Sequence, residues 1–323
     1  MSRRPPASRE PGRLRFIGLA VAAAVGAFLI AGQVERLVVA VVSPTTNTLE
    51  WISDLVLATG GGVATYLWLH LSATRTALAN LERARIVVDT QLAVAAELQR
   101  TLLPKTPPSR NGTTWSAELR AAWRIGGDYY DFVDPDDQTR IVLIADISGK
   151  GIPAALMLAY VRAVLREAAR TTTEPAALVS ELARSVYGDT GGKPYITCIA
   201  ARLDERERRL TYANAGHPAG LLIGPAGCRR LSVGGPPAGL LPQAAYEQET
   251  IQLARGDLVV FVTDGVSERL GRGLDDVVTR LEQRSLDASD AARAVMDLCE
   301  SPTATRPTAD WDDDRTVVAL HID

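Results

Sequence analysis

Aspartates stand at the ends of apolar, β-branched runs in the C-terminal half of the sequence. Asp146 ends "VLIAD", Asp264 ends "VVFVTD", and an acidic run precedes "RTVVAL". A carboxylate at the end of a buried strand is costly unless a positive charge meets it, and several together favour a hard divalent cation, Mg²⁺ or Mn²⁺. Two adjacent ions could activate a shared water and hold a phosphoryl group in line. The pattern predicts metal-assisted hydrolysis of a phosphate ester, although each aspartate alone could equally cap a turn.

The elements that must position these aspartates form an α+β pattern. Short apolar runs predict strands at residues 140–147, 195–203, 209–215, 257–264 and 315–322. Helices are predicted at residues 153–170, 174–187 and 289–299. Because the helices are grouped between runs of strands, the sequence predicts a sandwich and not a doubly wound parallel sheet. The acidic stretch "DPDDQT", which begins at Asp134, reads as a hairpin turn.

A Gly-Gly-Asp motif, Gly126 to Asp128 in "WRIGGDYYDF", fits two kinds of enzyme. Diguanylate cyclases follow GGD with an acidic residue and Phe, but Tyr129 stands at the acidic position here. Four later motifs follow in order: "ADISGKGIPAAL", "NAGHPAGLL", "TDGVSE" and "DDRTVV". With these motifs the chain resembles the SpoIIE/RsbU branch of the PP2C-like (PPM) metal-dependent phosphatases over nearly all of residues 97–323, beginning at "LQRTLLP".

The resemblance implies both a fold and a metal site. The fold would be an α/β/β/α sandwich of two antiparallel sheets, with two Mn²⁺ or Mg²⁺ ions at one edge. The implied ligands are Asp146, which would bridge both ions, the Ile147 carbonyl, Asp264, Asp313 and, directly or through water, Asp128. The four aspartates among them are the expected catalytic residues. We prefer Asp313 to Asp314 because the family pattern places its ligand three residues before the Thr, here Thr316.

For other residues near these motifs, the sequence gives weaker evidence of a role in the site. Arg124 could hold substrate phosphate by a bidentate contact, and Lys150 could touch it, although an exposed arginine and a solvated turn lysine are the alternatives. Gly149 and Gly151 flank Lys150 where the backbone is expected to pass close to the metals, with no room for side chains. We interpret His217 in "NAGHP" as a loop-shaping residue and not as a general acid, because it has no nearby partner in the sequence.

Two uncharged apolar segments precede the motifs. Residues 16–32 and 55–74 each approach the roughly 20 residues that span a bilayer. Arginines lie before the first segment and after the second, whereas the loop between them holds only Arg36. The positive-inside rule predicts a two-helix transmembrane hairpin over residues 16–74, with the tail 1–15 and the catalytic domain in the cytoplasm. A cleaved signal peptide is the alternative, which the second segment disfavours.

Residues 75–104 predict a helical linker that stops at Pro104. Six of eight a and d positions are apolar and Arg85 and Gln99 are the exceptions, which fits an imperfect coiled coil and a possible homodimer through residues 75–103. A helix lying on the catalytic domain is an equal alternative. The proline-rich "PKTPPSRNGTT" then marks the start of the predicted phosphatase domain, 105–323.

Composition disfavours other classes of function. A formal charge of −3 and the lack of an aromatic and basic stripe argue against nucleic-acid binding. The three cysteines are odd in number and far apart, so neither a disulfide framework nor a zinc site is expected. They are predicted to be buried thiols in a reducing compartment.

These patterns together predict a membrane-anchored, metal-dependent protein serine/threonine phosphatase. By resemblance, its substrate would be a phosphorylated anti-anti-sigma (STAS) protein of a partner-switching pathway. A catalytically weak relay protein that binds such a partner without turnover is the alternative, and the presence of all candidate ligands argues against it. A diguanylate cyclase is a remote alternative, because it leaves the later aspartate motifs unexplained.

Overall fold

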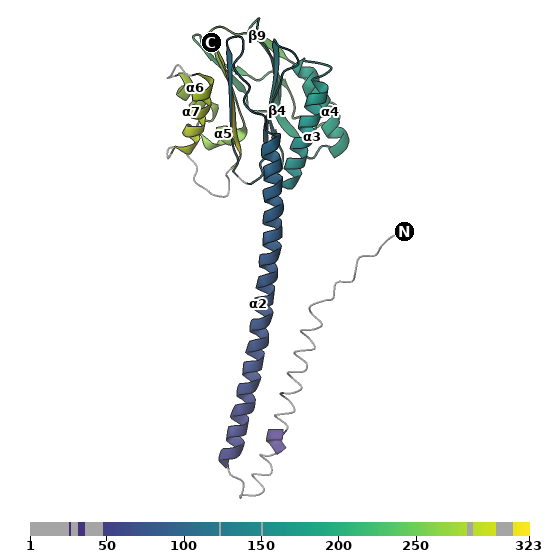
Figure 1. Cartoon of the computed structure of the whole chain (residues 1–323), viewed down its shortest axis with the longest axis vertical. Coiled ribbons are helices and arrows are strands. Elements are labelled where there is room, and N and C mark those ends of the chain that lie inside the picture. Colours follow the sequence, from purple (N-terminus) through teal and green to yellow (C-terminus); the bar gives the residue numbers. More distant parts are fainter. Residues whose placement is uncertain are drawn as a thin grey trace, which may run out of the picture. The chain divides into compact units, whose positions relative to one another are not determined.

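The computed structural model describes Gly26 and residues 32–35, 48–122, 124–149, 151–282, 287–301 and 313–323. The internal contacts divide the chain into two units, Met1–Val88 and Asp89–Asp323. The boundary falls within one long helix, α2 (Thr48–Leu102), which is drawn in Figure 1. The predicted linker at residues 75–104 is therefore helical as expected, but it is shared between the two units.

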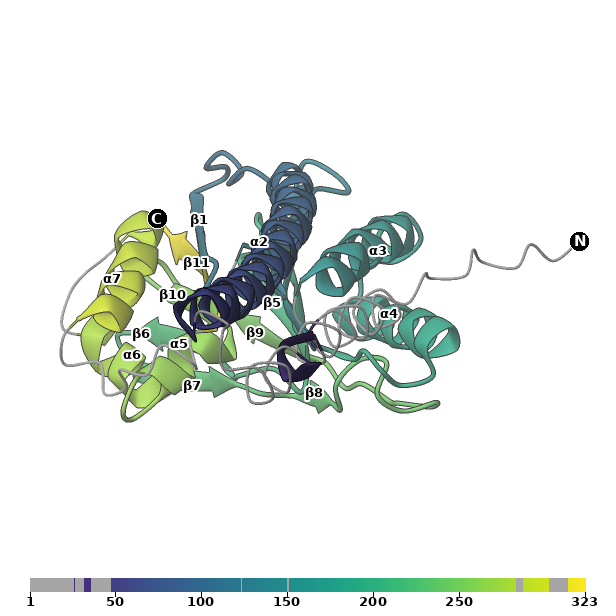
Figure 2. The same cartoon turned by 90° about the horizontal axis from the view of Figure 1, so that it is seen from below.

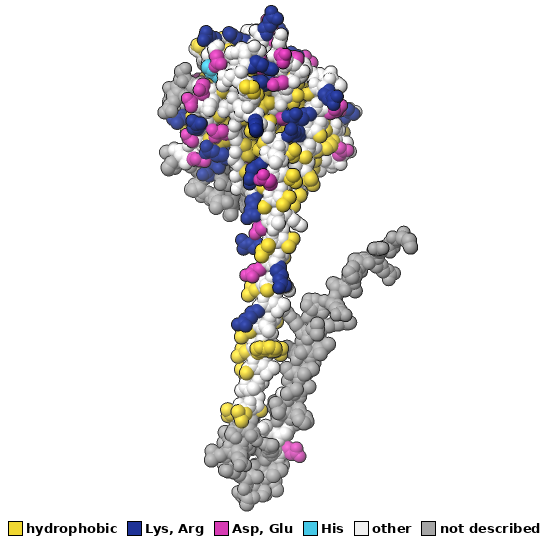
Figure 3. All heavy atoms as spheres, in the orientation of Figure 1, with side chains coloured by type: hydrophobic (Ala, Val, Ile, Leu, Met, Phe, Trp, Pro, Cys, Tyr) yellow, Lys and Arg dark blue, Asp and Glu magenta, His cyan; other side chains and the backbone are white. Residues whose placement is uncertain are grey.

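In the first unit, α2 exposes large apolar side chains, among them Val56, Leu57, Tyr66 and Trp68 (Figure 3). Within the part of the chain that the structure describes, no helix is both long enough and apolar enough to cross a membrane. The structure therefore does not support the predicted span at residues 55–74. The other predicted span, residues 16–32, lies outside the described residues except for Gly26 and Gly32.

Two sheets form the second unit. One has the strand order β1 (Thr113–Arg120), β11 (Arg315–Ile322), β10 (Leu258–Val262), β6 (Gly220–Gly224) and β7 (Gly227–Leu231). The other has the order β2 (Asp128–Val133), β3 (Thr139–Ile147), β4 (Ile196–Asp204), β5 (Arg209–Ala215) and β8 (Gly234–Gly235), and β9 (Glu249–Gln252) also pairs with β5. Among these strands only the short pairing of β5 with β8 is parallel.

Helices cover the outer faces of the two sheets (Figure 2). The sheet of β2 to β5 packs against α3 (Ile152–Ala168) and α4 (Pro175–Thr190). The other sheet packs against α5 (Asp264–Arg269), α6 (Leu274–Glu282) and α7 (Ala288–Glu300). A third apolar cluster fills the space between the sheets. The predicted α/β/β/α sandwich is confirmed.

Most predicted elements are present, with three differences. The strand predicted at 257–264 is too long, because β10 ends at Val262 and Asp264 begins α5. The structure also contains elements that were not predicted: β1, β2, β6, β7, β8, β9, α5 and α6. Strands β6 and β7, for example, have only five residues each, and both begin with glycine. Of the cysteines predicted to be buried, Cys198 and Cys299 are buried, whereas Cys228 is half-buried.

Candidate active site

The rows of apolar side chains between the sheets end in polar residues at one end of the sandwich. Alternate residues of a strand face the same side, so the row of Val142 and Ile144 on β3 continues to Asp146. The same alternation on the other strands ends in Asp128 (β2), Thr197 (β4), Asn214 (β5), Thr263 (after β10) and Thr316 (β11). The sandwich therefore gathers polar side chains from both sheets at one end of its interior.

Asp146 is the centre of a group of like charges at this end. Its pKa is raised to about 7, first by burial and then by repulsion from other carboxylates: Asp264, Asp313, Asp314 and Glu268. Burial and the charge of Asp313 also raise the pKa of Asp264. Among the described residues, no lysine or arginine forms an ion pair with Asp146, Asp264 or Asp313. A bound cation would relieve this repulsion.

The donor chemistry of the group fits a hard divalent cation, which prefers carboxylate and carbonyl oxygens. A Cβ on Gly127 would lie 2.6 Å from the Ile147 carbonyl oxygen and 3.0 Å from Asp146 Oδ1, so only glycine lets the backbone approach these two predicted ligands. No three Asp, Glu, His or Cys side chains in the described ranges, however, are close enough together to hold a metal ion. The two-ion site thus stays a prediction.

Asp128 connects the two sheets beside this group. Its side chain is buried, it stands opposite Asp146 in the β2–β3 register, and its Oδ2 accepts hydrogen bonds from Thr263 Oγ1 (2.8 Å) and Thr316 Oγ1 (2.7 Å). Burial raises its pKa well above the usual value, although both hydroxyls act in the opposite direction. This contact between sheets was not predicted from the sequence, and the predicted contact of Asp128 with a metal remains untested.

Asp314 holds the Gly-Gly-Asp loop. Its Oδ1 accepts a hydrogen bond from the Ala122 N–H (2.9 Å), and its Oδ2 accepts one from the Gly127 N–H (2.7 Å). A Cβ on Gly126 would lie 2.2 Å from Asp314 Oδ2, which explains the first glycine of the motif. Asp314 is thus engaged by the backbone of this loop, and the choice of Asp313 as the candidate metal ligand stays a prediction.

Gln99 has a different place from the one predicted. It is buried within the second unit, its Nε2 donates to the Gly126 carbonyl (3.0 Å), and its Oε1 accepts from the Gly126 N–H (3.2 Å). Arg124, the candidate phosphate ligand, donates from Nη1 to the Asp89 carbonyl on α2 (3.1 Å), and its contact with phosphate stays a prediction. Residues 89–102 of α2 therefore lie on the sandwich, as one of the two alternatives for the linker proposed, and Gln99 does not belong to an open coiled-coil seam.

The turn after Asp146 has two glycines in the left-handed region. Gly149 and Gly151 have φ angles of 121° and 76°, but a Cβ on either would meet nothing within 4 Å. Their positive φ angles favour glycine at both positions, and among protein atoms the close approach occurs at Gly127. Lys150 lies outside the described residues.

Two smaller predictions concern loops. The turn that begins at Asp134 is present, because Asp136 Oδ1 accepts from the N–H groups of Gln138 and Thr139. His217 does shape its loop, because its N–H donates to Asn214 Oδ1 and its carbonyl accepts from Asn214 Nδ2.

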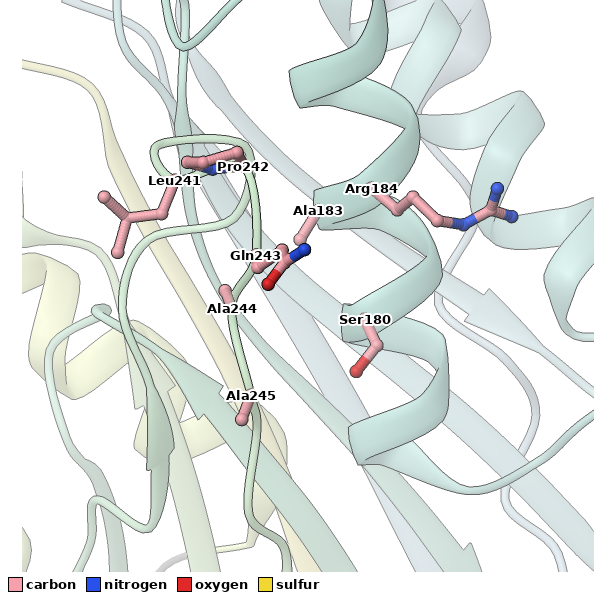
Figure 4. A pocket seen from close by; sticks show the side chains of 8 residues that line it. All are labelled: Ser180, Ala183, Arg184, Leu241, Pro242, Gln243, Ala244 and Ala245. Atoms are coloured by element: carbon pink, nitrogen blue, oxygen red, sulfur yellow. The ribbon is translucent and has the colours of Figure 1, made fainter.

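A cavity of about 440 Å³ lies elsewhere, between α4 and residues 241–245. Figure 4 shows Ser180, Ala183 and Arg184 lining it from α4. None of the predicted site residues lines this cavity, so it does not mark the chemistry that the sequence predicts.

Comparison with a protein family decides between the two readings of the Gly-Gly-Asp motif. The model of the Stage II sporulation protein E (SpoIIE) family matches residues 135–323. This chain belongs to the SpoIIE family. The match begins after the Gly-Gly-Asp motif, and so covers less of the chain than the expected 97–323.

Similar proteins agree with the SpoIIE assignment. Phosphoserine phosphatase RsbU of Bacillus subtilis is 30% identical over 183 residues, which are 56% of this chain and 54% of RsbU. The chain spans about half the length of the curated relatives that it matches first. The RsbU and RsbW domains of Rv1364c from Mycobacterium tuberculosis are 25% identical, with a TM-score of 0.56 over 66% of this chain and 61% of that one.

Two further solved structures share the fold of the SpoIIE-family domain. The SiaA-PP2C domain of Pseudomonas aeruginosa gives a TM-score of 0.63 at 19% identity and covers 74% of this chain and 99% of its own. RsbX in complex with magnesium gives a TM-score of 0.52 at 17% identity and covers 67% and 98%. These two likenesses show a PP2C-like fold.

Proposed function

We propose that this SpoIIE-family chain is a metal-dependent phosphatase that hydrolyses phosphoserine or phosphothreonine on a partner protein. The observation that carries the proposal is Asp146, whose pKa is raised to about 7 by burial and by carboxylates that the other sheet brings next to it. A group of acids in which Asp146 and Asp264 are half-buried, and which has no basic ion-pair partner among the described residues, is suited to bind cations. The name of the relative RsbU, a phosphoserine phosphatase, supports the same reaction.

The proposed cofactor is a pair of Mn²⁺ or Mg²⁺ ions. Asp146, Asp264, Asp313 and the Ile147 carbonyl would hold them. When bound, such ions activate water and neutralise the charge that develops on the phosphoryl group. The chain itself positions the ligands, because Asp314 fixes the Gly-Gly-Asp loop against the Ile147 carbonyl. The magnesium complex of RsbX supports a divalent cation.

The proposed substrate is a phosphorylated STAS-domain protein of a partner-switching pathway. The similarity to RsbU, and to a protein that carries RsbU and RsbW domains, supports this class of substrate. The direct test incubates the full chain with a phosphoserine-bearing STAS protein and measures released phosphate with Mn²⁺, with Mg²⁺ and with EDTA. Release that depends on the metal is expected. Binding of the partner without release would favour the relay protein, and formation of cyclic di-GMP from GTP would favour the cyclase.

The contact of Gln99 with the Gly-Gly-Asp loop gives a further prediction. Gln99→Leu would leave the Gly126 N–H and carbonyl without their partner, and a buried unsatisfied group costs about 1–3 kcal/mol. We expect the Gly-Gly-Asp loop to shift and turnover to fall, while the sandwich stays folded. Kinetics and thermal unfolding of the variant measure both effects. Arg100→Leu, one residue away with an exposed side chain, is the matched control. Equal effects of the two substitutions would contradict the idea that the contact of Gln99 with Gly126 supports turnover.

Dimerisation through residues 75–103 is a separate proposal, and it no longer includes Gln99. Arg85→Leu would remove the remaining polar residue from the predicted seam. We expect sedimentation to show a stronger dimer for this variant. A monomer at every concentration would leave the helix without a role in assembly.

Membrane attachment of the N-terminal part is also a proposal, supported by the uncharged residues 16–32 and the arginines around the two apolar segments. A reporter fused after Thr46 is expected to be exported, and one fused after Leu103 is expected to stay in the cytoplasm. Reporter activity in a bacterial host checks both fusions. Retention of the first fusion in the cytoplasm would show that no hairpin forms.

A further inference from the structure

The imidazole of His217 has contacts that shaping a loop does not require. The backbone of His217 is held by Asn214, and these two bonds would form with any side chain at this position. The ring itself is 6% exposed, and its Nδ1 lies 2.9 Å from Thr197 Oγ1. Its Nε2 is buried and makes no hydrogen bond of ordinary geometry with the described residues.

Thr197 connects the ring to the central carboxylate. It stands directly opposite Asp146 in the antiparallel register of β3 and β4. Directly opposed residues point to the same face, with their Cβ atoms about 4.5–5.5 Å apart. The Thr197 hydroxyl that meets His217 thus lies on the face of the sheet that carries the Asp146 carboxylate, at the end of the row that begins with Ile199.

The ring is uncharged at neutral pH. Burial lowers the pKa of His217 to about 3, so the imidazole can meet the Thr197 hydroxyl without a charged partner.

We propose that His217 is a positioning residue for the phosphatase reaction proposed above. Its neutral ring holds the Thr197 hydroxyl in place beside Asp146. The inference rests on the proposed function for its purpose, but its contacts are independent of the substrate. It assigns His217 no proton transfer.

The test measures Mn²⁺ binding to the full chain by calorimetry, so that it does not depend on turnover. Thr197→Val removes the hydroxyl at constant shape, and His217→Leu removes the ring. Residues that support metal ligands typically contribute 10–100-fold to metal affinity. We therefore expect each variant to raise the Kd for Mn²⁺ at least about 10-fold, and the double variant to be no weaker than the single ones, because both remove the same contact.

Conservative variants and a matched control complete the test. Thr197→Ser keeps the hydroxyl and His217→Asn keeps a polar atom near the position of Nδ1, so both should bind Mn²⁺ nearly as wild type does. Thr211→Val is the control, because it removes a hydroxyl bonded to Thr250 (2.9 Å) on the same sheet without involving any candidate ligand. It should leave Mn²⁺ affinity unchanged. An equal loss in Thr211→Val would make the effect a general loss of packing and overturn the proposal.

Two further outcomes distinguish a positioning role of His217 from other roles. Wild-type affinity in Thr197→Val, or independent losses that multiply in the double variant, would overturn the proposal even if His217→Leu fails to fold. If His217 were a general acid, His217→Asn would lose turnover, and the plot of turnover against pH would lose one limb. If His217 only positions Thr197, the shape of that plot should not change. If the proposed function is wrong but the positioning role is right, wild-type protein would bind Mn²⁺ and release no phosphate. The Thr197 and His217 variants would still show the expected changes in the Kd for Mn²⁺.

Discussion

Asp146→Asn should reduce phosphate release by several orders of magnitude, and Asp264→Asn should do the same. Both replacements keep the shape of the side chain but remove a charge from the group in which Asp146 has a pKa of about 7. In the proposed site both aspartates would bind metal, and a neutral amide would bind a divalent cation more weakly than a carboxylate. Phosphate release from a phosphoserine protein, metal content and circular dichroism should be measured on the same samples.

The matched control is Asp136→Asn, in the turn between β2 and β3. Asp136 Oδ1 accepts two backbone N–H groups and takes no part in the carboxylate group. Its replacement should leave turnover near wild type. Near-normal turnover of Asp146→Asn with unchanged metal content would show that the site is assigned to the wrong residues.

The same carboxylate predicts the effect of Asp146→Asn on stability. The pKa of Asp146 is raised in the folded protein from 3.8 to about 7, so its ionised form opposes folding above pH 7 when no metal is bound. This opposition disappears as the pH falls from about 7 toward 4. Metal-free Asp146→Asn should therefore be at least as stable as the wild type at pH 8. Urea unfolding of both proteins in EDTA measures whether the variant has the higher free energy of unfolding at this pH.

Glu205→Ala should destabilise the fold by about 3–5 kcal/mol, the usual cost of leaving a buried charge without its partner. Glu205 is 1% exposed, and it accepts hydrogen bonds from Arg110 Nε (2.6 Å) and Asn111 Nδ2 (3.0 Å). Arg140, also 1% exposed, lies 3.5 Å from it. Without Glu205, the contact with Asp134 would be the one ion pair left to the buried Arg140 guanidinium among the described residues.

Urea unfolding measures this effect, with Glu181→Ala as the control. Glu181 forms an ion pair with Arg184 at 2.6 Å, but both side chains are exposed, so its loss should cost about 1 kcal/mol or less. Arg140 stands at the opposite end of β3 from Asp146. Turnover per folded molecule should therefore survive in Glu205→Ala. Equal costs for the two substitutions would show that the buried network contributes no more than a surface pair.

Local sequence patterns located the candidate acids but not all of their contacts. The apolar run before Asp146 predicted a buried strand that ends in a carboxylate, and β3 has this form. The same reasoning placed Asp264 at the end of a strand, whereas it begins α5. The difference arose because an apolar run shows where a strand is buried, but not at which residue its hydrogen bonding stops.

By itself, the sequence determined the sandwich and the order of its motifs, since the alternation of apolar residues and the spacing of motifs are properties of neighbouring residues; the choice of Asp313 came from the family resemblance and stays a prediction. Only the tertiary structure decided that Asp128 joins Thr263 and Thr316, and that Gln99 holds Gly126. In the chain, Asp128 is 135 residues from Thr263 and 188 from Thr316. Such pairs depend on strand register and on how one sheet lies on the other, because these set which distant side chains meet, and no local pattern encodes them.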